Sequence, residues 1–137
     1  MGRLIRVMLA VATALDVAYW TIWFTDRSVL ASEHRAAYYQ FENAFPLADA
    51  WLGLACVLAL VALARHRPSA LLWLVAAGAA GLYLFGMDFL YDVEHGIFGK
   101  GGGGVVEAVI VLLTLVFSVT VLRFGWHRRY ALLAGRG

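Results

Sequence analysis

Four long apolar stretches constrain the fold of this sequence more than any other feature. They run over Leu4–Phe24, Pro46–Ala64, Ala70–Tyr91 and Val105–Leu122. A helix needs about 20 mainly apolar residues to cross the hydrocarbon core of a bilayer. Continuous apolar runs indicate helices, because the strands of a membrane barrel alternate polar and apolar residues. We therefore predict an all-α fold: an integral membrane four-helix bundle, with residues 1–137 forming a single transmembrane domain.

The composition excludes most soluble classes. Hydrophobic residues make up 63% of the chain and charged residues 15%, against about 45–50% and about 25% in soluble domains. A soluble domain of 137 residues has too little interior to bury so much apolar surface. The single cysteine, Cys56, excludes an internal disulfide. The net charge of +2 is too small to indicate a nucleic-acid partner.

The basic residues predict the orientation in the membrane. Three of the 11 Lys and Arg residues, Arg27, Arg35 and Lys100, lie in the first and third connections between the spans. The others lie at the N-terminal end, in the second connection and in the C-terminal tail: Arg3, Arg6, Arg65, Arg67, Arg123, Arg128, Arg129 and Arg136. Because cytoplasmic loops are enriched in Lys and Arg, both termini are expected in the cytoplasm. We expect a multi-pass protein of the cell membrane, of the bacterial inner membrane type.

The connections also carry structural signals. Apolar residues recur at helical spacing within Thr25–Phe45, which predicts a short interfacial helix with its aromatic side chains toward the lipid or the bundle. The short connection Arg65–Ser69 predicts an antiparallel hairpin of the second and third spans. The glycine-rich segment Gly99–Gly104 predicts a flexible linker.

The acidic residues lie on the side opposite to most arginines. Asp16 is the exception, because it falls near the middle of the first span. The others are Asp26, Glu33, Glu42, Asp49, Asp88, Asp92, Glu94 and Glu107. A charge at the centre of a membrane helix costs about 2.5–3.5 kcal/mol, so such residues face the bundle interior or a water-filled cavity and are candidates for function.

The third span carries the densest set of candidates. Asp88, Asp92 and His95 are spaced i, i+4 and i+7, which places them on one helical face, and Tyr91 lies beside that face. If the helix ends near Tyr91, Asp92 and His95 form a wet rim. If it continues to His95, they lie deeper in the bundle.

The other spans add one acid each to the predicted site. Asp16 has Trp20 one turn later, Asp49 has Gly53 one turn deeper, and Glu107 begins a mild polar stripe. Turning these faces inward predicts an acidic pocket open to the outside. The predicted ligand-binding residues are Asp16, Trp20, Asp49, Asp88, Tyr91, Asp92, His95 and Glu107. A simpler interpretation is that Asp49 and Glu107 complement the dipoles of helices that start at the outer face.

Three functions compete for this pattern. The first is binding or transport of a small cationic or amphipathic molecule, with protons and the cation competing for the carboxylates. The second is an enzyme that acts on a lipid-like or sterol-like substrate by carboxylate and histidine acid–base chemistry. The third is an accessory subunit of a membrane complex. A homo-oligomer is compatible with each function.

A metal site is a weaker hypothesis. Asp88, Asp92 and His95 offer three ligands, and His34 or Glu33 a fourth, but the spacing matches no ligand signature. We therefore predict no metal and no cofactor. The expected partners are the lipid bilayer and the small ligand.

Two segments carry a family resemblance. Leu15-Asp16-Val17-Ala18-Tyr19-Trp20 and Phe45-Pro46-Leu47-Ala48-Asp49-Ala50-Trp51 resemble small, uncharacterised bacterial four-span membrane proteins, which implies a fold but no activity. The layout is also similar to the EXPERA group of sterol isomerases and sigma-type receptors. That resemblance implies a ligand cavity between helices lined by Asp16, Asp49, Asp88 and Glu107. No EXPERA motif is matched in full, so no isomerase activity is implied.

Overall fold

The computed structural model describes residues 2–31 and 34–135, and this part of the chain is helical without a strand. Four helices are long and apolar enough to cross a membrane. They are α1 (Gly2–Asp26), α3 (Pro46–Ala64), α4 (Ala70–His95) and α5 (Gly101–His127). The predicted all-α bundle of four spanning helices is thereby confirmed, and the chain is a small polytopic membrane protein.

Four short elements connect or follow the spans. They are the 3-10 turns η1 (Arg27–Val29) and η2 (Ile97–Gly99), and the helices α2 (Ala36–Glu42) and α6 (Arg129–Leu133). The predicted helix in the first connection is α2. Its Tyr38 is only 1% exposed, so this aromatic ring faces the bundle. Pro46 then begins α3, where its missing N–H costs no hydrogen bond.

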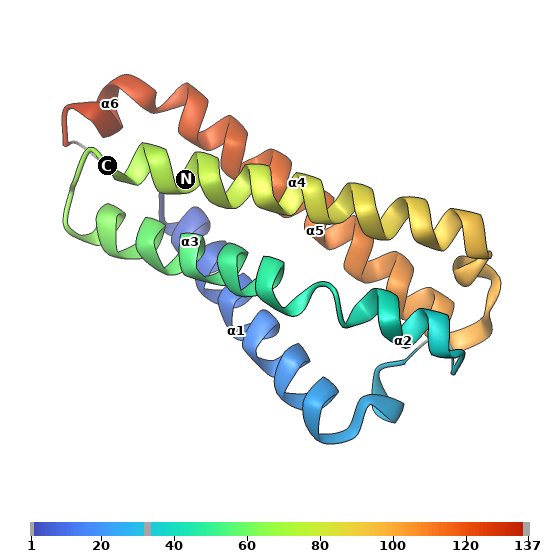
Figure 1. Cartoon of the computed structure of the whole chain (residues 1–137). Helices are drawn as coiled ribbons and strands as arrows, with labels where there is room; N and C mark the ends of the chain where they lie inside the picture. The colour runs from blue at the N-terminus through green and yellow to red at the C-terminus, as the bar shows by residue number, and fades with distance from the viewer. Residues whose placement is uncertain (1, 32–33, 136–137) are drawn as a thin grey trace.

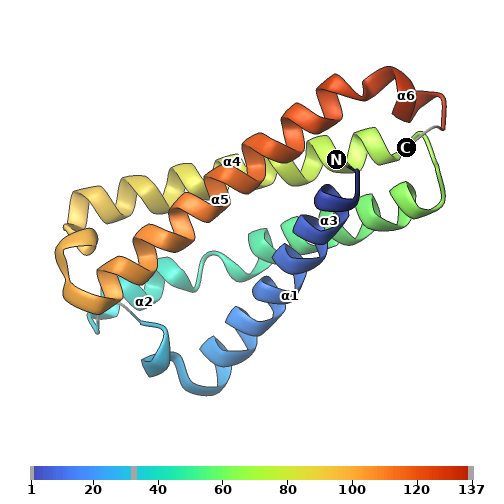
Figure 2. The same cartoon turned by 180° about the vertical axis from the view of Figure 1, so that it is seen from behind.

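The spanning helices pack in chain order. α1 lies against α3, α3 against α4, and α4 against α5, whereas α1 barely touches α5. Both views show α1 diverging from α4 and α5 toward its C-terminal end, while α2 lies below the far ends of α4 and α5 (Figures 1 and 2). The bundle is therefore tighter at one end than at the other.

The two ends differ in charge. The start of α1, the α3–α4 turn, the end of α5 and α6 lie together (Figure 1); we call this the arginine end, after Arg3, Arg6, Arg65, Arg67, Arg123, Arg128 and Arg129. The opposite end, with α2 and the α4–α5 connection, is the acidic end. The placement of the arginine end in the cytoplasm stays a prediction.

Small residues set the close contact of α4 with α5. A Cβ at Gly78 would lie 2.5 Å from Leu122 Cγ, and one at Gly81 would collide with Ser118 Oγ. Ser118 is fully buried and donates to the backbone carbonyl of Thr114 at 2.7 Å. These contacts make the small residues of α4 a surface for close helix packing.

The prediction of a flexible linker at Gly99–Gly104 is wrong. Gly101–Gly104 form the first turn of α5, which begins four residues before the predicted Val105. Gly104 is buried, and a Cβ there would collide with the backbone of the preceding turn. Glycine is needed at position 104 because the α4–α5 connection folds back tightly onto it, so this one residue of the run marks close packing.

A cluster of carboxyl groups at the acidic end

Five carboxyl groups from four helices gather at the acidic end. We call them the acid cluster: Glu42 of α2, Asp49 of α3, Asp88 and Asp92 of α4, and Glu107 of α5. Asp88 is close enough to the other four for their charges to interact. Glu42 likewise interacts with Glu107 and Asp92. None of the five is fully exposed, so like charges meet in a partly dehydrated space, where repulsion is stronger than in water.

Neutral side chains donate hydrogen bonds to three of these carboxyls. The Trp20 indole donates from Nε1 to Asp49 Oδ2 at 2.9 Å. The Tyr19 hydroxyl donates to Glu42 Oε2 at 3.3 Å, and the Tyr38 hydroxyl donates to Glu107 Oε1 at 3.0 Å. These donors come from α1 and α2, so both elements are tied to the rest of the bundle through the acid cluster.

Asp92 is the most deeply buried acid. Its side chain is 4% exposed, and its Oδ2 atom is buried without a hydrogen-bond partner among the described residues. Leaving a buried polar atom unsatisfied costs about 1–3 kcal/mol, and more for a charged group. Because α4 continues to His95, Asp92 lies inside the bundle and not on a wet rim.

Tyr91 and His95 lie beside the cluster as part of an aromatic stack. The Tyr91 ring stacks on Phe41 of α2 at 3.8 Å between centroids, and on His95 at 4.0 Å. His95 is exposed, and its Nδ1 lies 2.9 Å from the backbone oxygen of Tyr91. The stack therefore joins α2 to α4, and His95 forms its outer edge at the last residue of α4.

Asp16 lies next to the cluster, in a groove between α1 and α3. The groove has a volume of about 370 Å³. Its lining residues are Thr13, Asp16, Val17, Trp20 and Phe24 of α1, and Pro46, Ala50, Gly53, Leu54 and Val57 of α3. Val17, Phe24 and Leu54 are exposed apolar side chains, so the groove opens on a face that the bilayer would cover. The charge of Asp16 interacts with that of Asp49, which connects the groove to the acid cluster.

Gly53 provides the space that the Asp16 carboxyl occupies. A Cβ built on Gly53 would lie 2.5 Å from Asp16 Oδ2. The carboxyl thus rests directly on the backbone of α3, where α1 and α3 come close together.

The helix-dipole interpretation holds for one of the two acids to which it was applied. Asp49 lies in the first turn of α3, where a carboxylate complements the positive end of the dipole. Glu107 lies beyond the first turn of α5, because that helix already begins at Gly101. Its contact with Tyr38 gives it a place in the acid cluster.

The structure does not assemble the hypothetical metal site. Among the described residues, no group of three His, Cys, Asp or Glu side chains is placed to hold a metal ion. His34 Nδ1 lies 2.8 Å from the Tyr39 hydroxyl. Glu33 lies outside the described residues.

Sequence reasoning missed three members of this site: Tyr19, Tyr38 and Glu42. Tyr38 and Glu42 are one helical turn apart on α2, so the spacing places them on one face. That signal is weak in a helix of seven residues. Their role depends on α2 folding back under α4 and α5, which is a tertiary contact.

Comparisons with protein-family models, with curated proteins and with solved structures found no match. The functional argument therefore rests on the geometry of the site.

Proposed function

We propose that this protein binds a small organic cation or cationic amphiphile at the acid cluster, in exchange for protons. The observation that carries the proposal is the buried, unpartnered Oδ2 of Asp92 within a group of interacting carboxyls. A buried carboxylate is stable only when it is protonated, paired or hydrogen-bonded. The donors described above form hydrogen bonds to Glu42, Asp49 and Glu107. Asp88 and Asp92 are therefore the acids that a bound cation would neutralise.

The surrounding aromatic rings support an organic cation as the ligand. Tyr38 and Tyr91 have ring centroids 6.2 Å apart, and Trp20 reaches the cluster through Asp49. Aromatic faces attract ammonium and phosphonium groups, most strongly where water is excluded. A bare metal ion is less suitable, because it needs several ligand atoms at fixed short distances.

Protons and the cation should compete for the same oxygens. Neighbouring carboxyls in a partly buried site hold protons in the absence of another positive charge. Binding of a cation would release protons, so affinity should rise with pH as the cluster ionises.

Calorimetric titration of the full chain in nanodiscs tests the proposal. The probes are tetraphenylphosphonium and a long-chain trimethylammonium ion, at several pH values. Asp92→Asn and Asp88→Asn should each weaken binding about tenfold or more, equivalent to about 1.4 kcal/mol, and should flatten the pH dependence. Glu94→Gln is the matched control, because Glu94 is an exposed acid on the same helix. Equal binding by all variants, or no binding of either probe at any pH, would refute the proposal and favour an accessory subunit.

The α1–α3 groove supports a second candidate function, a lipid-directed enzyme. An apolar groove with a carboxyl group, open toward the bilayer face, suits a substrate that enters from the lipid. Asp16 would act as the proton donor or acceptor, and Asp49, held by Trp20, would influence its charge. Incubation with membrane lipid extracts, followed by mass spectrometry, should then reveal a product that Asp16→Asn abolishes.

A further inference from the structure

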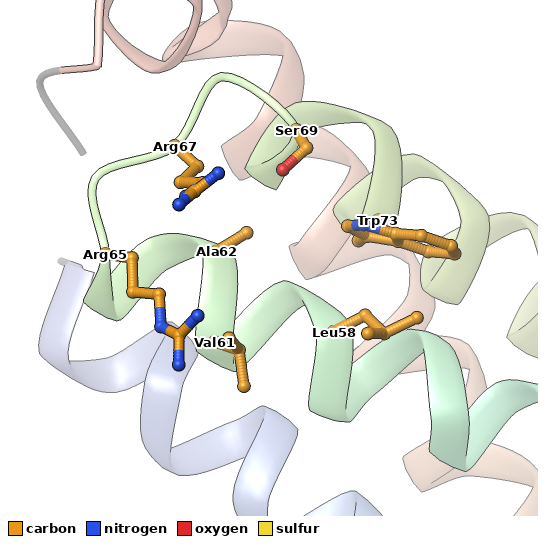
Figure 3. Close-up of a pocket in the computed structure, with 7 residues that line it drawn as sticks. All are labelled: Leu58, Val61, Ala62, Arg65, Arg67, Ser69 and Trp73. Carbon is orange, nitrogen blue, oxygen red and sulfur yellow. The ribbon is translucent and has the colours of Figure 1, made fainter.

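The arginine end contains a second cavity whose chemistry is opposite to that of the acid cluster. It lies at the α3–α4 turn and has a volume of about 210 Å³. Its lining residues are Leu58, Val61, Ala62, Arg65, Arg67, Ser69 and Trp73 (Figure 3). The cavity thus has basic and hydroxyl groups from the turn and apolar groups from the two spans.

The polar and apolar groups occupy different parts of this cavity. Figure 3 shows the Arg67 guanidinium and the Ser69 hydroxyl entering the space above Ala62, from the turn. Leu58 of α3 and Trp73 of α4 form the wall that continues along the spans. A polar compartment therefore lies at the level of the helix ends, and an apolar one lies beside it at membrane depth.

The backbone of the turn fixes these positions. The amide of Arg67 donates to the carbonyl of Ala62 at 2.8 Å, and His66 between them has a positive φ of 50°. This is the pattern of a helix that ends with one residue in the left-handed conformation, so its last carbonyls are satisfied within the turn. The side chains of Arg65 and Arg67 are therefore not required to complete the end of α3.

The polar groups of the cavity are available for a ligand. Within residues 2–31 and 34–135, the side chains of Arg65, Arg67 and Ser69 make no hydrogen bond or ion pair. Two other arginines at this end are engaged in hydrogen bonds. Arg6 donates to the Leu63 carbonyl at 3.1 Å, and Arg129 donates to the Trp126 carbonyl at 2.7 Å. Two guanidinium groups thus retain their donors beside a free hydroxyl.

We propose that this cavity binds an anionic phospholipid, with the phosphate between Arg67 and Ser69 and an acyl chain along Leu58 and Trp73. A guanidinium fork matches phosphate oxygens in geometry and charge. The apolar wall favours a lipid over free phosphate, and a tryptophan ring suits the headgroup level of a membrane. The second positive charge, on Arg65, favours an anionic headgroup over a zwitterionic one, because it repels a headgroup ammonium.

Native mass spectrometry of the full chain, released from mixed micelles, tests this proposal directly. The protein is titrated with phosphatidylglycerol or with phosphatidylcholine of the same acyl chains. The wild type should retain phosphatidylglycerol at least fivefold more than phosphatidylcholine. Arg67→Gln should lower phosphatidylglycerol retention by about fivefold or more. Arg65→Gln should lower the ratio of retained phosphatidylglycerol to retained phosphatidylcholine. Circular dichroism confirms that each variant remains helical.

Two controls separate this site from general charge attraction. Arg128→Gln removes an exposed arginine at the same end of the bundle but outside the cavity, and it should leave retention unchanged. Leu58→Trp keeps every charge and fills the apolar part, so it should lower retention. Equal losses in Arg128→Gln and Arg67→Gln would overturn the proposal, as would full retention in Leu58→Trp. Displacement of the lipid by millimolar inorganic phosphate would also overturn it, because the cavity would then be a site for the free anion.

Discussion

The contact of Asp16 with Gly53 makes a quantitative prediction about the α1–α3 interface. Gly53→Ala places a methyl group 2.5 Å from Asp16 Oδ2, whereas its distance to Asp16 Cγ, 3.7 Å, is ordinary. The Asp16 side chain must therefore turn away, at a cost of about 0.5–1.5 kcal/mol for an off-rotamer torsion. Alanine in place of glycine stabilises a helix by about 1 kcal/mol. In the wild-type background the two effects nearly cancel.

The cancellation disappears when the carboxyl group is removed. With Asp16→Ala, the Gly53→Ala change should stabilise the protein by the full helix-propensity term, about 1 kcal/mol. The interaction energy of this double-mutant cycle should therefore be about 0.5–1.5 kcal/mol. Asp16→Asn keeps the shape of the side chain without its charge, so a cycle built on Asp16→Asn should give an interaction energy near zero if the effect is steric.

Unfolding by SDS in mixed micelles measures the free energies for this cycle. Gly86→Ala is the matched control, because a Cβ at Gly86 has no neighbour within 4 Å. Its effect should be the same with and without Asp16→Ala. An interaction energy near zero between Asp16→Ala and Gly53→Ala would show that the Asp16 carboxyl does not rest on α3, and the description of the groove would be wrong.

Three further predictions concern packing, hydrogen bonding and topology. Gly78→Ala should destabilise the bundle by about 1–3 kcal/mol in the same unfolding assay, because its methyl group meets α5 at 2.5 Å, whereas Gly86→Ala should not. Trp20→Phe should lower the free energy of unfolding by about 1–3 kcal/mol, because it leaves Asp49 Oδ2 without its indole donor. An unchanged free energy of unfolding would show that this hydrogen bond does not stabilise the bundle. A cysteine at Gly102, in a background without the native cysteine, should react with an impermeant thiol reagent added to intact cells. Labelling only after lysis would reverse the predicted orientation.

The spanning helices were predictable because their cause is local. Each apolar run must satisfy its backbone within itself in lipid, and a helix does so without reference to the rest of the fold. The start of α3 at Pro46 and its end at Ala64 match the prediction. The end of α4 at His95 and the start of α5 at Gly101 were less predictable, because the residues there are polar or glycine and lie outside the apolar runs.

The acid cluster was predictable in part, for a different reason. The cost of charge in a membrane brings Asp49, Asp88, Asp92 and Glu107 toward the interior regardless of their exact partners. The role of Glu42 depends on the folding of α2 beneath α4 and α5, which no local pattern encodes.

The acidic end allows one last prediction, because a single substitution should change the stability of the protein and its affinity for the cation in opposite directions. Asp92 Oδ2 is a buried acceptor without a donor, and the groups whose charges reach Asp92 include the acid Glu107. Asp92→Asn replaces that oxygen with an amide that can donate to a neighbouring carboxylate. The change should therefore stabilise the protein by about 1–3 kcal/mol, the cost of an unsatisfied buried polar group. It should also weaken cation binding.

This trade-off is typical of functional sites, where a costly arrangement persists because activity needs it. The gain in stability should be largest at neutral pH and should shrink in acid, where protonation already removes the repulsion among the carboxyls. Glu94→Gln, on the exposed side of α4, should change neither stability nor binding. If Asp92→Asn instead destabilises the bundle at neutral pH, the carboxylate has a stabilising partner, and the unpartnered oxygen on which the binding proposal rests does not exist.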